Sequence, residues 1–328
     1  MTTLQEPIGS GFGAAATAGD VMQDIHLSGR IAIVTGGASG IGTETTRALR
    51  SAGARVIVPA RNPEKAQAAL EGINGVEIEA MDLMDPASID AFAERFLASG
   101  QPLHILVNSA GVMAAPLIRD ARGYESQFAT NHLGHFQLTA RLLPALRRAH
   151  EARVVAVSSL GHRRSPVVFE DLNFERRDYD PLLAYGQSKT ANILFALALD
   201  EREKAAGVRA FSLHPGGVFG PGMEKYLSAE SLRAAGMIDE NGKPILDLKK
   251  GFKTAEQGAA TSLWCAASPQ LNGMGGVYCE NSDIAPIMSD QDQHGLIPFG
   301  VMPFAVDPEA ADRLWDLSER FLGRRFGA

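Results

Sequence analysis

The feature that most constrains the fold is an alternation between short, mostly apolar runs and longer segments with helical character. Six runs are predicted to be strands, at residues 31–35, 55–59, 76–80, 104–108, 153–158 and 208–213. Five segments between them are predicted to be helices, at residues 40–52, 63–71, 86–99, 124–150 and 184–206. Apolar strands separated by helices indicate a parallel sheet covered on both faces. The chain is therefore predicted to be an α/β protein.

The alternation runs without a break, so one domain over residues 26–328 is predicted. Residues 1–25 are interpreted as an N-terminal arm, loose over 1–20, where Gly, Ala and Thr predominate, with a short helix at 17–23. A long insertion at 219–252 is predicted to cover a substrate, because long insertions in compact domains tend to be functional lids. The alternative is a disordered surface loop.

Composition narrows the function classes. Apolar residues make up 45% of the chain and charged residues 21%, which is typical of a globular protein with a large core. A net charge of -7 argues against a general nucleic-acid binder. The two cysteines, Cys265 and Cys279, provide neither a disulfide framework nor a zinc site, so a cytoplasmic setting is expected. Neither a signal peptide nor a membrane-spanning run is apparent.

A glycine-rich turn follows the first predicted strand. The strand IAIV at residues 31–34 continues directly into TGGASGIG at 35–42, and a predicted helix comes next. Gly36, Gly40 and Gly42 would let the backbone approach a phosphate and keep the helix close to the sheet. The helix N-terminus then binds the pyrophosphate of a dinucleotide. An ordinary strand-to-helix turn is the alternative.

The end of the second predicted strand bears on the choice of cofactor. An acidic residue is expected here when the cofactor has a free ribose 2′-hydroxyl, but the chain has Ala60 followed by Arg61. A guanidinium binds a 2′-phosphate in a forked geometry, which favours NADP(H) over NAD(H). A solvated loop arginine is the alternative. Asp82, after the third strand, is positioned for the adenine amino group or equally for a helix N-cap.

Tyr185 and Lys189 lie four residues apart in a predicted helix. This spacing puts a phenol and an ammonium on one face, where the ammonium is expected to lower the pKa of the phenol. Taken alone, the pair is equally compatible with an ordinary surface helix. Combined with the glycine turn, it indicates proton transfer beside a nicotinamide cofactor.

These residues occur within a larger set of motifs, listed here in chain order: TGGASGIG at 35–42, NSAG at 108–111, Asn131, SS at 158–159, YGQSK at 185–189 and HPG at 214–216. In these motifs the chain resembles the short-chain dehydrogenase/reductase family across nearly its whole length. The segments 131–136 and 158–162, and the long gap before Tyr185, resemble the retinol dehydrogenase and WW-domain-oxidoreductase-like branch. The resemblance implies a Rossmann-type, doubly wound parallel sheet of about seven strands in three layers.

The resemblance also implies catalytic roles. Tyr185 would be the general acid in reduction and the general base in oxidation. Lys189 would hold the nicotinamide ribose and lower the Tyr185 pKa, helped by the positive charge of an oxidised nicotinamide. Ser159, rather than Ser158, would hydrogen-bond the substrate oxygen. Asn131 would kink its helix and hold a water in a proton relay with Lys189.

The implied cofactor contacts extend over the motifs. Asn108, Ala110 and Gly111 would line the adenosine ribose, and Pro215, Gly216 and Val218 would bracket the nicotinamide. The full expected set is Gly36, Ser39, Gly40, Ile41, Gly42, Arg61, Asp82, Leu83, Asn108, Ala110, Gly111, Tyr185, Lys189, Pro215, Gly216 and Val218. The chain has Ser109 and Gly220 where the family usually has Asn and Thr, and these departures bear on cofactor affinity more than on chemistry.

The resulting hypothesis is NADP(H)-dependent hydride transfer to or from a carbonyl/alcohol pair of a small, hydrophobic substrate, with reduction the favoured direction. The hydrophobic preference rests on apolar residues of the insertion: Met223, Tyr226, Leu227, Met237 and Ile245. Reduction of an activated carbon–carbon double bond and a non-catalytic NADP-binding regulator are the alternatives. No metal site is expected, since His132 and His135 lack a third ligand. Family members often pair through the segments matching 124–150 and 184–206, which implies a homodimer or homotetramer unless the insertions block it.

Overall fold

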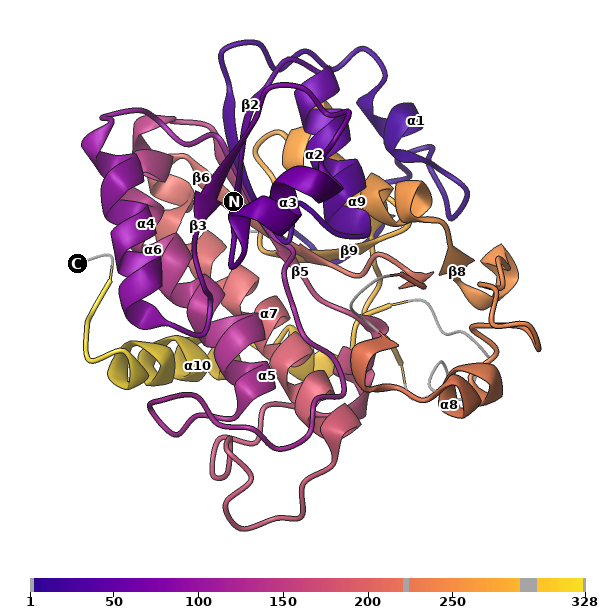
Figure 1. Ribbon diagram of the computed structural model, residues 1–328. Helices are drawn as coiled ribbons and strands as arrows, with labels where there is room; N and C mark the ends of the chain where they lie inside the picture. Colours follow the sequence, from indigo (N-terminus) through magenta and orange to yellow (C-terminus); the bar gives the residue numbers. More distant parts are fainter. Residues whose placement is uncertain (1–2, 221–223, 290–299, 327–328) are drawn as a thin grey trace.

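The structure is a computed structural model, and it describes residues 3–220, 224–289 and 300–326. A sheet of eight strands crosses its centre in the order β10-β9-β6-β5-β4-β1-β2-β3 (Figure 1). The strands are β1 (Ile31–Thr35), β2 (Arg55–Ala60), β3 (Val76–Ala80), β4 (Ile105–Asn108), β5 (Ala152–Val157), β6 (Val208–Leu213), β9 (Val277–Glu280) and β10 (Asp283–Ile284). All neighbouring strands are parallel except β9 and β10.

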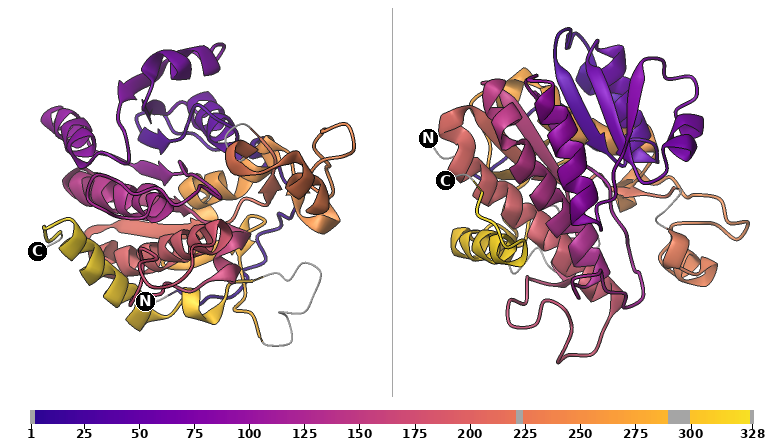
Figure 2. Two further views of the ribbon diagram at one scale, coloured as in Figure 1. Left: turned by 60° about the horizontal axis from the view of Figure 1, so that its bottom comes forward. Right: turned by 60° about the vertical axis from the view of Figure 1, so that its left-hand side comes forward.

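Helices cover both faces of the sheet (Figure 2). The main helices are α1 (Ala18–Met22), α2 (Ile41–Ser51), α3 (Pro63–Ala69), α4 (Pro86–Ala98), α6 (Gly134–Arg148), α7 (Pro181–Glu203), α9 (Ala255–Ala267) and α10 (Pro308–Phe321). Side chains of β1 alternate between two cores: Ile31 and Ile33 belong to the core that includes residues of α4, α6, α7 and α10, whereas Ala32 and Val34 belong to the core that includes residues of α1, α2 and α9. Burial on both faces explains why this strand is apolar from Ile31 to Val34.

The predicted fold class is confirmed. The seven parallel strands form the expected doubly wound sheet, and the six positioned strands agree with the structure to within one residue at each end. The short antiparallel β10 was not predicted. It follows a tight turn in which Asn281 and Ser282 both have positive φ, and two residues are too few to leave a sequence pattern.

The predicted helix over 124–150 is helical from Ser126 to Arg148, with an interruption inside it. The segment divides into α5 (Ser126–Phe128), a π-helical turn over Ala129–Leu133, and α6. Asn131 occupies the centre of the π turn, which is the interruption that the resemblance implied for it. Single π turns inside helices occur frequently at functional sites.

The N-terminal arm is attached to the sheet edge, so the expectation that it is loose is wrong. The Gln5 side chain accepts a hydrogen bond from the Tyr278 amide and donates to the carbonyl oxygens of Tyr278 and Ala285. The Asp283 carboxylate accepts from the amides of Ile8, Gly9 and Ser10. These contacts are made by single side chains, which composition does not reveal.

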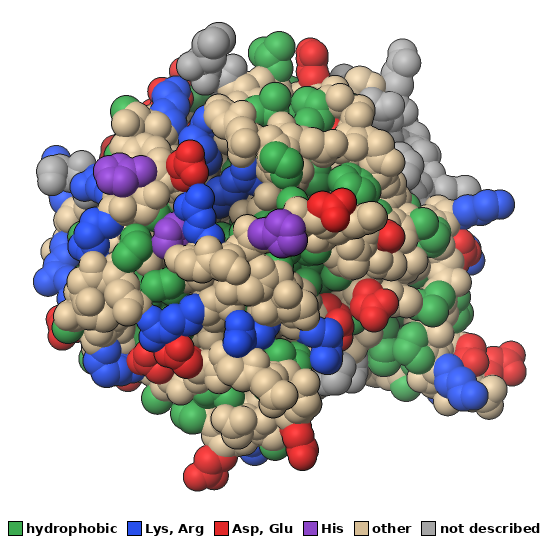
Figure 3. Space-filling view, turned by 90° about the horizontal axis from the view of Figure 1, so that it is seen from above, with side chains coloured by type: hydrophobic (Ala, Val, Ile, Leu, Met, Phe, Trp, Pro, Cys, Tyr) green, Lys and Arg blue, Asp and Glu red, His purple; other side chains and the backbone are tan. Residues whose placement is uncertain are grey.

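The insertion after β6 forms a small separate layer beside the sheet, on the right of Figure 1. It contains a two-stranded parallel sheet of β7 (Gly217–Val218) and β8 (Phe252–Lys253), and the short helix α8 (Ala229–Ala234). On the face seen in Figure 3, basic and acidic side chains lie side by side rather than in a single basic stripe. Among the described residues, none of the helices combines the length and apolar character that crossing a bilayer requires.

Candidate active site

The motifs converge at one edge of the sheet. The glycine turn follows β1, the NSAG segment follows β4, Ser159 follows β5, and His214–Gly216 follows β6. These strands are parallel, so their carboxyl ends meet at the same edge, where ligands bind in open α/β sheets. Segments more than 170 residues apart in the chain are thus brought together.

The glycine turn is tightly packed. Gly36 has a φ of 67°, and a Cβ there would lie 2.9 Å from the Ala110 Cα. A Cβ on Gly42 would lie 2.1 Å from the Gly36 carbonyl oxygen, so neither position admits a side chain. Gly40 is the N-cap of α2 and has no side-chain oxygen to accept from the first-turn amides, although Ile41 begins the helix there. These amides are suited to an anion such as a pyrophosphate.

The turn contains one further expected contact residue, Ser39. Its amide donates to the Gly36 carbonyl, and its own carbonyl accepts from the Gly42 amide. These two hydrogen bonds close the loop between strand and helix without any contribution from a distant segment.

Arg61 extends from the end of β2 and is exposed. It makes no hydrogen bond or ion pair within the described part of the chain, whereas the neighbouring Asn62 caps α3 by accepting from the Lys65 amide. A guanidinium with no protein partner at this point is available to a phosphate.

The loop after β3 shows that one alternative for Asp82 is wrong. The N-cap of α4 is Asp85, not Asp82. The Asp82 carboxylate instead accepts from the Met84 amide inside a tight turn and is half-buried. Leu83 is buried against α6, where its carbonyl oxygen closely approaches Gly134.

The NSAG segment is held by Thr35 at the end of β1. The Thr35 hydroxyl oxygen accepts from the amides of Ser109 and Ala110. Asn108 is buried and donates its side-chain amide to Thr139 of α6. This hydrogen bond ties the start of the NSAG segment to α6.

Asn131 is buried and fully engaged. Its Oδ1 accepts from the Val112 amide, and its Nδ2 donates to the Val112 carbonyl and to the Ser188 hydroxyl. Lys189 lies near the same glycine, since a Cβ on Gly111 would lie 3.1 Å from Asn131 Oδ1 and 3.5 Å from Lys189 Nζ. The structure thus brings Asn131 and Lys189 together beside Gly111.

Tyr185 and Lys189 are both buried on α7, and the Lys189 Nζ lies 5.6 Å from the centre of the Tyr185 ring. Lys189 donates to the Val157 carbonyl at 2.9 Å. The Ser159 hydroxyl accepts from the Gly161 amide at 3.0 Å, and it is close enough to the Tyr185 phenol to act on its pKa. The Ser158 hydroxyl instead donates to the Lys189 carbonyl. Of the two serines, Ser159 is therefore the one that meets Tyr185.

The expected lowering of the Tyr185 pKa is not found in the protein alone. Burial raises the pKa of Tyr185, and the nearby Ser159 hydroxyl only partly opposes this effect. Burial also lowers the pKa of Lys189 to about 8. The prediction from spacing considered only the attraction between the phenolate and the ammonium, which lowers the pKa of Tyr185 and raises that of Lys189. Loss of hydration disfavours both charged forms and therefore shifts both pKa values the other way.

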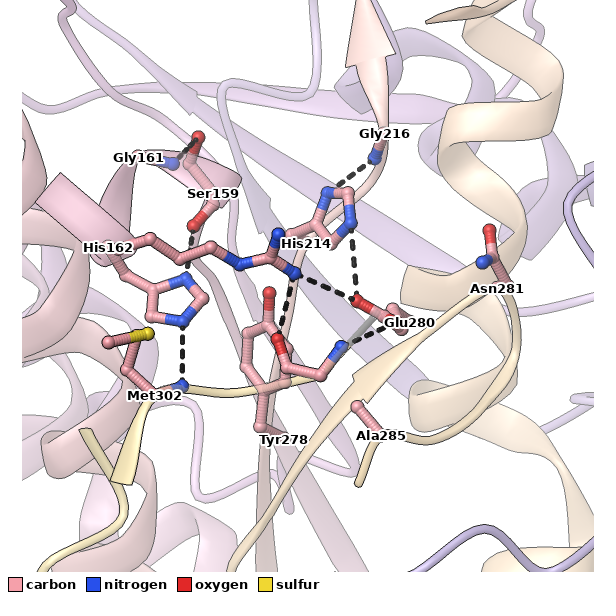
Figure 4. Close-up of polar contacts among 12 residues, drawn as sticks. Ser159, Gly161, His162, His214, Gly216, Tyr278, Glu280, Asn281, Ala285 and Met302 are labelled. Atoms are coloured by element: carbon pink, nitrogen blue, oxygen red, sulfur yellow. Dashed lines mark hydrogen bonds and ion pairs between the residues drawn. The ribbon is translucent and has the colours of Figure 1, made fainter. Parts of the chain in front are cut away.

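The loop after β6 lies against a buried polar cluster that the sequence did not reveal (Figure 4). Pro215 and Val218 are buried, and the Gly216 amide donates to His214 Nδ1 at 2.9 Å. His214 Nε2 lies 3.5 Å from Oε2 of Glu280, the last residue of β9. Burial raises the pKa of Glu280 to about 7, although Arg163, the Gly300 amide and Lys253 oppose the rise. The sequence did contain one sign of this cluster, because the apolar strand sequence VYCE ends in a glutamate.

Comparison with known proteins agrees with this arrangement. The family described as short chain dehydrogenase matches residues 30–231. A "Probable oxidoreductase" from Streptomyces lividans is 47% identical over 300 residues, which cover 89% of this chain and 97% of that protein. Human retinol dehydrogenase 12 is 38% identical over 310 residues, which cover 92% of this chain and 89% of that protein.

Solved structures show the same fold. An uncharacterised protein from Mycobacterium paratuberculosis superposes with a TM-score of 0.70 at 32% identity, covering 93% of this chain and 98% of that one. The active-site complex of Pseudomonas aeruginosa RhlG with NADP superposes with a TM-score of 0.59 at 26% identity, covering 77% of this chain and 94% of that one. The family match spans more than half of the chain, and the retinol dehydrogenase relative agrees with the branch that the motifs indicated. The chain belongs to the short-chain dehydrogenase/reductase family and is an oxidoreductase of that family.

Proposed function

We propose that this protein transfers hydride between NADP(H) and the carbonyl/alcohol pair of a small, apolar substrate. The observation that carries the proposal is the proximity of the Ser159 hydroxyl, the Tyr185 phenol and the Lys189 ammonium, at the edge of the sheet where the glycine turn also lies. A phenol, a second hydroxyl and an ammonium at the ligand-binding edge of a doubly wound sheet are the groups that carbonyl reduction needs.

The chain's own residues supply the proton chemistry. Tyr185 would donate its phenolic proton to the carbonyl oxygen in reduction and take it back in oxidation. The Ser159 hydroxyl accepts from the Gly161 amide, which leaves its own hydrogen available to donate to the substrate oxygen. Lys189 would hold the nicotinamide ribose and, with Asn131, would complete a proton path through water. The bound nicotinamide would supply or accept the hydride.

A dinucleotide is supported by the open space beside Gly40, the N-cap of α2, where a Cβ would meet nothing within 4 Å and a pyrophosphate could approach the start of the helix. The preference for NADP(H) rests on Arg61, which is exposed and has no partner among the described residues. Cells keep this cofactor mostly reduced, which favours reduction of the substrate carbonyl.

The substrate preference rests on the insertion after β6. Tyr226, Leu227, Met237 and Ile245 are half-buried there, and Met223 lies outside the described residues. Leu246 is exposed over 61% of its surface, so apolar contact area is available in the same segment. We infer a hydrophobic carbonyl compound, in keeping with the retinol dehydrogenases among the relatives.

We also propose that the protein assembles as a homodimer or homotetramer. Helix α10 restricts how it forms, because Trp315 stacks on Phe195 and Asp312 pairs with Arg202, both on α7. Pairing through α6 and α7 would therefore use the surface that α10 leaves uncovered. The cytoplasmic setting is supported by the two buried, unpaired thiols.

A screen tests the proposal. Ketones, aldehydes, steroids and retinoids are incubated with NADPH, and cofactor consumption is followed by absorbance in wild type and in Tyr185→Phe. We expect one apolar carbonyl class to be reduced by wild type only. Equal consumption in the two proteins would contradict the role of Tyr185, and no consumption of NADPH by wild type with any compound would favour a non-catalytic NADP binder.

A further inference from the structure

A buried polar cluster lies behind the loop expected to contact the nicotinamide, at the ends of β6 and β9 (Figure 4). It contains His214, Glu280, Arg163 and Lys253, and each is largely shielded from solvent. The proton-transfer role proposed for Tyr185, Ser159 and Lys189 does not use these groups. Ionisable side chains are rarely buried together unless their interactions compensate for lost hydration.

His214 holds a single tautomer. Its Nδ1 accepts the Gly216 amide at 2.9 Å, so this nitrogen has no proton. Burial lowers the pKa of His214 well below its usual range, with the nearby charge of Lys253 acting in the same direction, so the ring is neutral. The one ring proton is therefore on Nε2, the nitrogen 3.5 Å from the Glu280 carboxylate.

Glu280 is itself fixed in place. Its Oε1 accepts the Gly300 amide at 3.0 Å, and Arg163 donates to the Gly300 carbonyl at 2.9 Å. Its Oε2 has no hydrogen bond from the described residues and lies between His214 Nε2 and the Arg163 guanidinium, which is 4.0 Å away. Burial raises the pKa of Glu280 to about 7, so the carboxyl group is mostly ionised above pH 7, and an ionised carboxylate oxygen accepts hydrogen bonds but donates none.

Gly216 depends on this arrangement for its conformation. Its φ of 93° belongs to the region that glycine favours, and the methylene chain of Lys253 packs against it, since a Cβ there would lie 2.7 Å from Lys253 Cδ. The Lys253 ammonium donates to the Asn281 side chain next to Glu280. The hydrogen bond from the Gly216 amide to His214 closes a turn like the one that an asparagine side chain forms with the amide two residues later.

We propose that Glu280 is a positioning residue for the nicotinamide end of the cofactor: it selects the His214 tautomer whose Nδ1 accepts the Gly216 amide, and so holds the Pro215–Gly216 turn in its binding conformation. This inference rests on the proposed function, because that function brings the nicotinamide to Gly216. Without the carboxylate, the tautomer with its proton on Nδ1 becomes accessible. That proton would oppose the Gly216 N–H, and the turn would open.

The test separates the two ends of the cofactor. Calorimetry measures the affinities of wild type and Glu280→Leu for NADPH and for 2′,5′-ADP, which has only the adenine half. We expect Glu280→Leu to bind NADPH about tenfold more weakly, as for one lost hydrogen bond, and 2′,5′-ADP as wild type does. Equal affinity for NADPH in the two proteins would overturn the inference, and so would an equal loss for both ligands.

A second background tests whether the effect passes through His214. In His214→Asn, the shorter side chain accepts the Gly216 amide and has no tautomer to select. Adding Glu280→Leu to this variant is expected to change NADPH affinity by less than about twofold, because the coupling between the two residues is gone. A tenfold loss in both backgrounds would show that Glu280 acts by another route and would overturn the inference.

The wild-type protein provides a readout that does not depend on folding of the variants. Long-range proton–nitrogen spectra of histidine-labelled protein should show His214 protonated at Nε2. Protonation at Nδ1 would overturn the inference. Failure of wild type to bind NADPH would count against the proposed function, whereas the tautomer would still report on the His214–Gly216 turn.

Discussion

Gly161 allows the position of Tyr185 to be tested without changing its chemistry. A Cβ at this position would lie 2.8 Å from the Tyr185 Cε1 and 2.9 Å from its Cδ1. Carbon atoms in contact normally lie about 3.5–4.0 Å apart, so the ring would have to retreat by about 1 Å. A displacement of about 1 Å at a reacting group costs about 100-fold in rate. We therefore expect Gly161→Ala to lower kcat about 100-fold.

The backbone itself accepts the change, because Gly161 lies in a 3-10 turn and outside the left-handed region. The assay is the rate of NADPH consumption with a carbonyl substrate found by the screen, together with NADPH affinity from fluorescence titration. Affinity should stay within about threefold of wild type, since the Gly161 contact is to Tyr185 rather than to the glycine turn. Gly13→Ala is the matched control, because a Cβ there meets nothing within 4 Å. A kcat for Gly161→Ala equal to that of the control would refute the reasoning.

Three further predictions follow from the same geometry. Gly42→Ala should weaken NADPH binding at least about 100-fold by calorimetry, because its Cβ would displace the Gly36 carbonyl and the turn with it; unchanged affinity would remove this turn from the cofactor site. Arg61→Ala should weaken NADPH binding about tenfold and leave NADH binding unchanged, since only NADPH has the 2′-phosphate; equal losses would contradict the role of Arg61. Burial lowers the pKa of His132 to about 3 and of His135 to about 4, below the unfolded value of 6.5, so their neutral forms stabilise the protein above pH 6.5 and this contribution is lost as the pH falls toward 4. Each of the two histidines contributes of order 3 kcal/mol to the free energy of unfolding, so the melting temperature should fall as the pH is lowered from 6.5 to 4. Glu280, with its raised pKa, opposes this fall between pH 7 and 4.5. A constant melting temperature would contradict the burial argument.

The strands could be predicted because burial on both faces leaves an unbroken apolar run, as at residues 31–34. The glycine turn could be predicted because contacts near 2 Å, such as the one at Gly42, exclude every side chain. The pairing of Tyr185 with Lys189 depends only on helix geometry, and the two residues do lie on one buried face of α7. These features are local, so their signals lie within short stretches of sequence.

Features that depend on the order of the strands in the sheet could not be predicted from short stretches of sequence. Arg163, His214 and Glu280 follow or end three different strands, and they meet only because β5, β6 and β9 are neighbours. In the protein alone the pKa of Tyr185 is raised and not lowered, because burial depends on everything packed around α7. The N-terminal arm was misjudged for a related reason, since its attachment depends on single contacts such as those of Gln5.

Transfer of label from cofactor to product tests the central claim most directly. NADPH carrying deuterium at C4 of the nicotinamide is incubated with the carbonyl substrate and either wild type or Tyr185→Phe, and the product is analysed by mass spectrometry and NMR. We predict deuterium on the carbinol carbon of the wild-type product, and a rate about 100- to 10,000-fold lower in Tyr185→Phe, which should still bind NADPH. Turnover at the wild-type rate in Tyr185→Phe would contradict the assignment of Tyr185. Deuterium at the β-carbon of a product whose carbonyl group is intact would instead identify reduction of a carbon–carbon double bond.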